Sequence, residues 1–214
     1  MNDLSDYRKS YDKSELLENS IPEDPINLFN RWFHEVEECG GDSEVNAMTV
    51  STIGLDGFPR ARVVLLKKFS AEGFIFYTNY NSEKGRAILE NDKVCLSFFW
   101  PTMERQVIIK GTASKTLNSI SDNYFDSRPD GSKLGAIASN QSEVVLSRAE
   151  LEDNLQKLAL EFINIPIPRP EYWGGFIVEP KEVEFWQGRP NRLHDRIRYV
   201  LQNDLSWKID RLAP

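Results

Sequence analysis

The feature that most constrains the fold is a series of short apolar segments separated by turn signals. The segments are 47–53, 59–69, 74–78, 93–100 and 105–116. They are rich in valine, isoleucine, threonine and aromatic residues, which favour strands. Leu55-Asp56-Gly57-Phe58, between the first two, is typical of a hairpin turn. The pattern therefore predicts an antiparallel meander.

Helix signals interrupt and follow this meander. Asp24 can cap a helix whose first position is Pro25, and Gly40-Gly41 ends the apolar repeat of that helix. Ser82 can cap a second helix, and the sequence from Ser147 to Glu150 is a capping box. Besides the first helix, the predicted helices cover 82–91, 117–127, 132–139 and 147–162.

Strand signals return after a proline-rich connector, at 175–178, 181–186, 196–202 and 207–212. About eight strands in hairpin order, with helices inserted, predict a closed or nearly closed antiparallel barrel. The expected fold class is therefore mainly β (α+β), with peripheral helices. A chain of 214 residues suits one domain. We expect the polar residues 1–22 to form a mobile arm and residues 23–214 to form a single domain.

Composition excludes several classes of function. The chain has 26 basic and 33 acidic residues, a net charge of −7, so it is a poor candidate for nucleic-acid binding. Two cysteines and two histidines are too few for a disulfide framework or a histidine metal site. No apolar run is long enough to span a membrane, and the N-terminal residues have no signal-peptide core. We expect a cytoplasmic protein without a metal, a nucleic-acid partner or a membrane contact.

Basic residues nonetheless gather in three places along the chain. These are Arg60, Arg62, Lys67 and Lys68; Lys84 and Arg86; and Arg189, Arg192, Arg196 and Arg198, which surround His194. Alternation places Arg62 and Lys67 on opposite faces of one strand unless a bulge or twist intervenes, so they could bind two different anions. The alternative is solvated surface charge. Separate clusters favour small phosphorylated ligands over a polymer, which needs one continuous basic stripe.

Two further segments carry groups suited to a ligand. Trp186 and His194 lie close together in the sequence among arginines, a combination that can line a site for an aromatic ligand. Tyr124, Arg128 and Ser132, around a predicted helix end, can supply three donors to one phosphate. The alternatives are a tryptophan in the core beside a polar turn, and an ordinary helix C-terminus.

Taken in order, these segments resemble the pyridoxine (pyridoxamine) 5′-phosphate oxidase family. The matching segments are 62–67, 76–79, 104–107, 124–129, 141–142, 173–175 and 184–188, and the most diagnostic are 191–196 and 207–214. The resemblance runs from about Tyr7 to Pro214. It implies a split antiparallel β-barrel that works as a homodimer, with FMN held between the subunits. It also implies oxidation of pyridoxamine or pyridoxine 5′-phosphate to pyridoxal 5′-phosphate, with dioxygen reduced to hydrogen peroxide.

The resemblance also implies roles for individual residues. The expected FMN contacts are Arg62, Val63, Val64, Leu65, Leu66, Lys67, Tyr77, Thr78, Lys84, Gln106, Gln141, Ser142, Trp186 and Arg196. The expected substrate contacts are Arg8, Tyr11, Lys67, Tyr124, Arg128, Ser132, Arg192 and His194. Arg192 and His194 are the expected catalytic residues, covering the pyridine ring. Arg62 and Lys84 would meet the FMN phosphate, and Lys67, Tyr124, Arg128 and Ser132 the substrate phosphate.

One position departs from the pattern of the family. Glu83 lies where a basic residue is expected before Lys84, which leads to the hypothesis that FMN binding depends more on Arg62 and Ser142 here. Three other functions compete with the oxidase. They are a split-barrel flavin enzyme with another substrate, such as a reductase; a non-catalytic module that binds or stores FMN or pyridoxal phosphate; and a nucleic-acid-binding barrel, against which the net charge argues.

Overall fold

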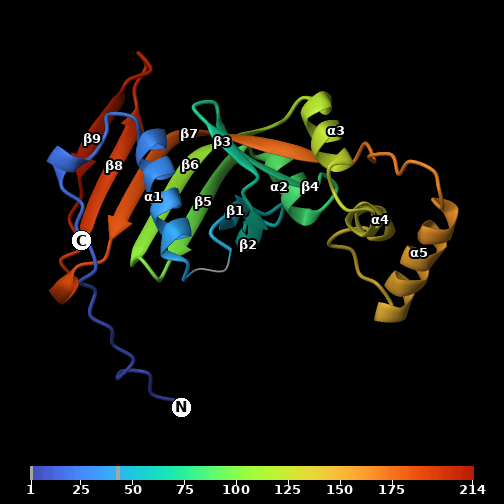
Figure 1. Ribbon diagram of the computed structural model, residues 1–214, viewed down its shortest axis with the longest axis horizontal. Helices are drawn as coiled ribbons and strands as arrows, with labels where there is room; N and C mark the ends of the chain where they lie inside the picture. Colours follow the sequence, from blue (N-terminus) through green and yellow to red (C-terminus); the bar gives the residue numbers. More distant parts are fainter. Residues whose placement is uncertain (1, 42–43) are drawn as a thin grey trace.

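The strands form one antiparallel sheet in the computed structural model, which describes residues 2–41 and 44–214 (Figure 1). The strands are β1 (Ala47–Ile53), β2 (Pro59–Leu65), β3 (Lys68–Ser70), β4 (Gly73–Asn79), β5 (Lys93–Trp100), β6 (Arg105–Lys115), β7 (Trp173–Gln187), β8 (Asp195–Leu201) and β9 (Trp207–Arg211). The helices are α1 (Pro25–Cys39), α2 (Glu83–Glu90), α3 (Asn118–Asp126), α4 (Asp130–Ala138) and α5 (Arg148–Glu161), with short 3-10 turns at Glu18–Ser20 and Pro190–Arg192.

The sheet is curled, and a short link joins its two end strands. Its order is β2-β1-β5-β6-β7-β4-β3, so the two end strands are neighbours in the sequence, separated only by Leu66 and Lys67. The Leu66 N–H donates to the carbonyl of Asn46, just before β1, at 2.8 Å, whereas the Lys67 N–H donates to the carbonyl of Ile75 on β4 at 2.9 Å. The chain thus changes its partner strand within two residues. This confirms the predicted antiparallel barrel, but the single strand expected at 59–69 is wrong.

Strand β7 is longer than expected. The sequence predicts two strands, at 175–178 and 181–186, because Pro180 cannot donate to a ladder. In the structure one strand of 15 residues runs through Pro180, and its register against β6 shifts where Gly111 faces Pro180. On its other side β7 pairs with β4 as far as Val178, opposite Phe74, and with β8 from Glu182, opposite Val200, so no described strand pairs with Pro180 there. A bulge is where a sheet tolerates proline.

Helix α1 packs against the barrel. The Asp24 carboxylate accepts a hydrogen bond from the Ile26 N–H at 2.8 Å, and Gly40 ends the helix in the left-handed conformation, as predicted. The buried face of the helix includes Phe29, whose ring lies 5.0 Å from that of Phe74 and 5.1 Å from that of Phe98. Burying an aromatic side chain of this size contributes about 1.5–3 kcal/mol.

A second, smaller core lies beside the barrel. Phe125, Leu134, Ile167 and Trp173 are buried together, between α3, α4 and the start of β7. Helix α5 buries none of its residues and lies at the far edge of the molecule (Figure 1). This core therefore holds α3 and α4 against one end of β7.

The predicted arm divides into two stretches among its described residues. Residues 2–10 are exposed. Residues 12–22 contact the body: Leu16 is buried, and the Tyr199 hydroxyl donates to the Pro22 carbonyl at 2.8 Å. That residues 1–22 move as a unit stays a prediction, as does the domain boundary after residue 22. Within the described ranges no helix is long and apolar enough to cross a bilayer.

Candidate functional site

A cavity of about 970 Å³ lies between the barrel and helices α2, α3 and α4. It brings together most of the predicted ligand contacts. These are Arg62, Val63, Val64, Leu65, Lys67, Tyr77, Thr78, Lys84, Tyr124, Arg128, Ser132, Gln141 and Ser142. The cavity lies at the upper end of the size range of small-molecule sites, roughly 300–1,000 Å³.

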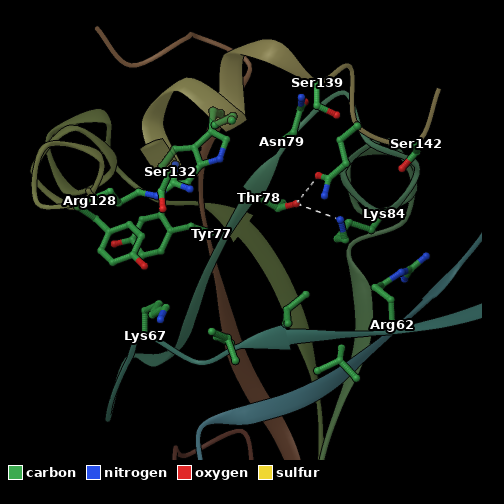
Figure 2. A pocket seen from close by; sticks show the side chains of 18 of the residues that line it. Arg62, Lys67, Tyr77, Thr78, Asn79, Lys84, Arg128, Ser132, Ser139 and Ser142 are labelled. Atoms are coloured by element: carbon green, nitrogen blue, oxygen red, sulfur yellow. Dashed lines mark hydrogen bonds between the residues drawn. The ribbon is translucent and has the colours of Figure 1, made fainter. Parts of the chain in front are cut away.

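One end of the cavity is formed by Arg62 and Lys84 (Figure 2). Lys84 is only 8% exposed, and its ammonium donates to Thr78 Oγ1 at 3.1 Å. Burial lowers the pKa of Lys84 to about 8, and the positive charge of Arg62 acts in the same direction. The Arg62 guanidinium donates to Thr52 Oγ1 at 2.8 Å. Two cations this close, one of them buried, are suited to a doubly charged anion.

Helix α2 adds polar groups to the same end. Its N-cap is Ser82, whose hydroxyl accepts a hydrogen bond from the Gly85 N–H. Ser142, with a left-handed φ of 78°, accepts a hydrogen bond from the Glu83 N–H at 3.2 Å. Left-handed backbone at a non-glycine residue is uncommon and concentrates at functional sites. The Ser142 hydroxyl, which lines the cavity, and the start of the helix extend the anion-binding character of this end.

The other end of the cavity contains Lys67, Arg128 and Ser132 (Figure 2). Tyr124 also lines the cavity and stacks on Tyr77. The Arg128 guanidinium lies 4.6 Å from the ring centroid of Trp173, and burial lowers the pKa of Arg128. Its Nη1 is buried and has no hydrogen-bond partner in the described protein. Buried donors are nearly always paired, so an unpaired guanidinium N–H in a cavity points to an anionic ligand.

An aromatic stack supports this second end. The rings of Tyr77 and Tyr124 lie 3.8 Å apart with an interplanar angle of 15°, and Trp173 lies 5.7 Å from Tyr77, again nearly parallel. The stack joins β4, α3 and β7, and it carries Arg128 on Trp173. It therefore fixes the positions of two of the predicted phosphate donors, Tyr124 and Arg128.

The expectation that Arg62 and Lys67 face opposite sides of one strand is wrong. The break at Leu66 and Lys67 redirects the chain, and both cations line the same cavity. Figure 2 shows them at its two ends. Leu66, a predicted FMN contact, is buried in the barrel core and does not line the cavity.

Another group of predicted residues lies elsewhere. Gln106, Trp186 and Arg196 are direct cross-strand neighbours on β6, β7 and β8, so they share one face of the sheet. Tyr11 and His194 join them: their rings lie 5.7 Å and 4.6 Å from that of Trp186. We call these five residues the distal cluster. None of them lines the cavity.

The distal cluster and the cavity lie at opposite ends of β7. Trp173 lines the cavity and Trp186 belongs to the cluster, thirteen residues further along the same strand. At roughly 3.3 Å per residue, this separation is about 40 Å. One small ligand therefore cannot touch both groups within one chain.

Arg8 and Arg192 are not among the described residues that line the cavity. Arg8 is exposed, and its Nε donates to the carbonyl of Ser5. Arg192 is also exposed and follows Asn191, with left-handed φ angles of 61° and 57° respectively. Two consecutive left-handed residues form a tight turn that ends two residues before His194, at a cost of about 1–3 kcal/mol each.

The sequence of the chain places this architecture in a family. Residues 41–161 match the family described as pyridoxamine 5′-phosphate oxidase, and residues 173–214 match the pyridoxine 5′-phosphate oxidase C-terminal dimerisation region. The chain belongs to the pyridoxamine 5′-phosphate oxidase family. This confirms the resemblance seen in the sequence.

Relatives of this family member cover its whole length. Proteins named pyridoxine/pyridoxamine 5′-phosphate oxidase are 76% identical in Flavobacterium johnsoniae and 69% identical in Flavobacterium psychrophilum, over 100% of both chains in each case. The crystal structure of PhzG from Burkholderia lata 383, in complex with tetrahydrophenazine-1-carboxylic acid, is 28% identical, with a TM-score of 0.87 over 96% of this chain and 100% of that chain.

A more distant structure shows the same fold. It is a pyridoxamine 5′-phosphate oxidase-related, FMN binding protein from Nostoc punctiforme, 14% identical, with a TM-score of 0.69 over 86% of this chain and 96% of that chain. The mainly β, split-barrel class expected from the sequence is therefore confirmed.

Several residues that line the cavity of this family member were not predicted as contacts. They are Arg60, Asn79, Glu83, Ser139 and Trp173, with Pro129, Gly135 and Ala136. Trp173 had a signal in the sequence, because it opens the 173–175 segment that resembles the family. Asn79 had the same kind of signal, because it ends the 76–79 segment that resembles the family. Ser139 had none, because it takes its place through the packing of α4.

Proposed function

We propose that this protein is an FMN-dependent oxidase that converts pyridoxamine and pyridoxine 5′-phosphate to pyridoxal 5′-phosphate. With the amine, dioxygen and water are consumed and ammonia and hydrogen peroxide are released. With the alcohol, dioxygen is consumed and hydrogen peroxide is released. Membership of the family and the names of full-length relatives support this activity.

The observation that carries the proposal is one cavity with a cationic group at each end. Arg62 and Lys84 form one end, and Lys67 and Arg128 form the other (Figure 2). Two phosphomonoesters, one on the cofactor and one on the substrate, need two such ends. A ligand with a single phosphate, bound at the end formed by Arg62 and Lys84, would leave the buried Nη1 of Arg128 without a hydrogen-bond partner.

The residues at the first end fit FMN. Arg62, Lys84 and Ser142 would hold its phosphate, and Thr78 and Gln141, which are hydrogen-bonded to each other at 3.3 Å, would lie beside it. When bound, FMN supplies two-electron oxidation and is regenerated by dioxygen. The protein supplies the position of the reactants and the charge around them.

The residues at the second end fit the substrate phosphate. Lys67, Arg128, Tyr124 and Ser132 offer two cations and two hydroxyls around one space. Because the aromatic stack holds Tyr124 and Arg128, the substrate phosphate would be bound in one position. The pyridine ring, which is attached to this phosphate, would then also be held in one position. Holding two reactants in this way can contribute up to about 7–11 kcal/mol to lowering the barrier.

A second copy of the chain would complete the site. The distal cluster lies about 40 Å along β7 from the cavity of its own chain, and Trp186, His194 and Arg196 of this cluster lie within residues 173–214, which match a dimerisation region. A homodimer can bring the cluster of one subunit to the cavity of the other, with FMN between them. Gln106, Trp186 and Arg196 would then lie near the flavin ring. Arg192, His194, Tyr11 and Arg8 would cover the pyridine ring.

The decisive experiment is anaerobic mixing of the FMN-loaded protein with pyridoxamine 5′-phosphate. We expect the yellow flavin absorbance to bleach, and admission of dioxygen to restore it with release of pyridoxal 5′-phosphate and hydrogen peroxide. Pyridoxamine without its phosphate is the control and should bleach the flavin far more slowly. A yellow protein that does not bleach would instead be a binding or storage module.

A further inference from the structure

The cavity contains one acidic side chain among the described residues that line it. Glu83 is the first residue of α2 and is adjacent to Lys84, whereas Arg60, Arg62, Lys67, Lys84 and Arg128 supply five basic groups. A carboxylate at a helix N-terminus favours the helix. The same carboxylate repels an anion that binds at this end of the cavity, so its presence there needs an explanation.

Strand β2 provides the explanation. Arg60 and Arg62 lie two residues apart on β2, opposite Thr52 and Val50 of β1, so their side chains leave the same face of the strand. The Arg60 guanidinium forms an ion pair with the Glu83 carboxylate. The Arg62 guanidinium in turn donates to the Arg60 carbonyl at 2.9 Å. Strand β2 thus places Arg62 at the anion-binding end of the cavity and Arg60 beside Glu83.

The pair contributes little to folding. The Arg60 side chain is 61% exposed and that of Glu83 is 30% exposed, and ion pairs in such surroundings add little net stability. The location of the pair indicates a role in ligand binding. Both partners line the cavity, and the Glu83 N–H donates a hydrogen bond to the Ser142 hydroxyl. An unpaired Glu83 would direct its full negative charge into the space that Arg62 and Lys84 make favourable for phosphate.

We propose that Arg60 neutralises Glu83, and that this pair lets the cavity accept the phosphate of its flavin although an acidic residue lies beside it. Arg60 is therefore a positioning residue that acts through Glu83 and determines the preference for phosphorylated over unphosphorylated flavin. The inference rests on the proposed function. It predicts that the two side chains are coupled: the effect of losing Arg60 depends on whether Glu83 is charged.

The test is a double-mutant cycle on the full-length, flavin-free protein. The dissociation constants of FMN and riboflavin are measured by quenching of flavin fluorescence for wild type, Arg60→Ala, Glu83→Gln and the double variant. We expect Arg60→Ala to weaken FMN binding about tenfold or more and riboflavin binding less than about twofold. Glu83→Gln alone should not weaken FMN binding. Adding Glu83→Gln to Arg60→Ala should restore FMN affinity to within about threefold of wild type.

Two further variants sharpen the test. Arg60→Lys keeps the charge and should keep FMN affinity close to that of wild type. Glu90→Gln removes a carboxylate at the other end of α2, away from the cavity, and should not rescue Arg60→Ala. A double variant that binds FMN as weakly as Arg60→Ala overturns the proposal, because Arg60 would then act without Glu83. An unchanged FMN affinity in Arg60→Ala also overturns it. Wild type that fails to bind FMN would instead refute the proposed function.

Discussion

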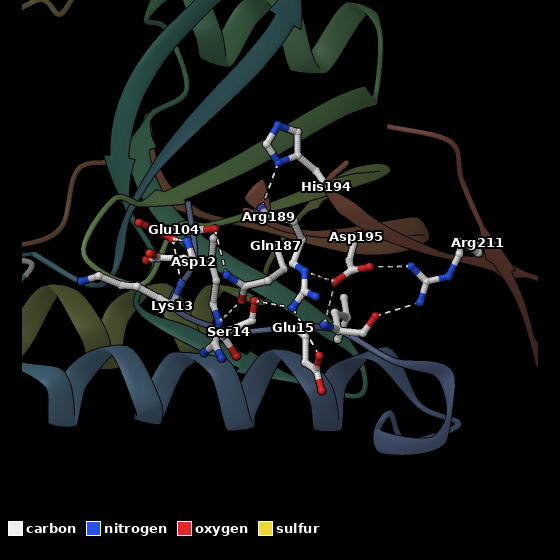
Figure 3. A network of polar contacts seen from close by, with 12 residues as sticks. Asp12, Lys13, Ser14, Glu15, Glu104, Gln187, Arg189, His194, Asp195 and Arg211 are labelled. Carbon is white, nitrogen blue, oxygen red and sulfur yellow. Dashed lines mark hydrogen bonds and ion pairs between the residues drawn. The ribbon is translucent and has the colours of Figure 1, made fainter. Parts of the chain in front are cut away.

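The backbone N–H of Arg189 donates a hydrogen bond to Nδ1 of His194 over 3.1 Å (Figure 3). A backbone amide can only donate, so Nδ1 is the unprotonated nitrogen, and the neutral imidazole carries its proton on Nε2. Burial lowers the pKa of His194, and the charge of Arg192 adds to this effect, while Asp195 opposes it. His194 therefore presents a donor, not a base, on the side away from Arg189.

This arrangement predicts the outcome of two substitutions. His194→Ala should lower kcat/KM for pyridoxamine phosphate about tenfold, the equivalent of about 1.4 kcal/mol and close to the value of one hydrogen bond. His194→Gln should recover most of the loss, because its amide N–H replaces Nε2–H. Steady-state kinetics between pH 6 and 9 provide the measurement. If glutamine is as poor as alanine and one limb of the pH profile disappears, His194 is a proton acceptor.

Lys84 predicts a pH dependence of cofactor binding. Its burial lowers its pKa to about 8. A lysine with a lowered pKa loses its charge as the pH rises through that value. FMN affinity should therefore fall above pH 8, by up to about tenfold per pH unit. Lys84→Arg stays charged and should remove this dependence. Fluorescence titrations from pH 7.5 to 9.5 test this, with riboflavin as the control ligand, and a flat wild-type profile for FMN contradicts the assignment of Lys84.

Contacts of Glu104 and Gly188 hold the N-terminal segment, residues 11–13, against the body of the protein. The Glu104 carboxylate, 1% exposed, accepts hydrogen bonds from the N–H groups of Asp12 at 2.9 Å and Lys13 at 3.2 Å (Figure 3). A Cβ added at Gly188 would lie 2.8 Å from Tyr11 Cβ and Cγ. Docking therefore requires glycine at this position, and the docked segment places Tyr11 against Trp186.

Gly188→Ala should release the segment. We expect trypsin to cleave after Lys13 about tenfold faster, because proteolysis follows the population of the open form. The KM for the phosphorylated substrate should rise while FMN affinity stays unchanged. Gly131→Ala is the matched control, since a Cβ there meets nothing within 4 Å. Unchanged cleavage in Gly188→Ala would show that the segment does not depend on this contact.

The separation along β7 predicts complementation between subunits. Arg128→Ala damages the cavity and Arg196→Ala damages the distal cluster, so each homodimer should be nearly inactive. A heterodimer of the two, purified through two different tags, contains one site with both defects and one intact site. It should recover about half of the wild-type activity. If each site is built from one subunit, every site in the heterodimer carries a defect and no activity returns.

Local signals in the sequence predicted the helix ends closely. Asp24, Ser82 and Ser147 each cap a helix, and each accepts a hydrogen bond from a backbone N–H two or three residues along the chain. The contacts that decide a cap lie within one turn, so the sequence contains all the partners. The strands at 47–53 and 93–100 were predicted to the residue for the same reason, since apolar alternation and turn residues mark their ends.

Sequence alone therefore determined the antiparallel character of the chain, its helix ends and, through resemblance, the family. Tertiary structure decided how the cations are combined. The break at Leu66 and Lys67 exists because the chain leaves β1 and pairs with β4, and only this closure brings Arg62 and Lys67 into one cavity. Likewise, the continuous β7 separates the cavity from the distal cluster. Strand pairing joins residues far apart in the sequence, and local propensities do not specify that choice of partner.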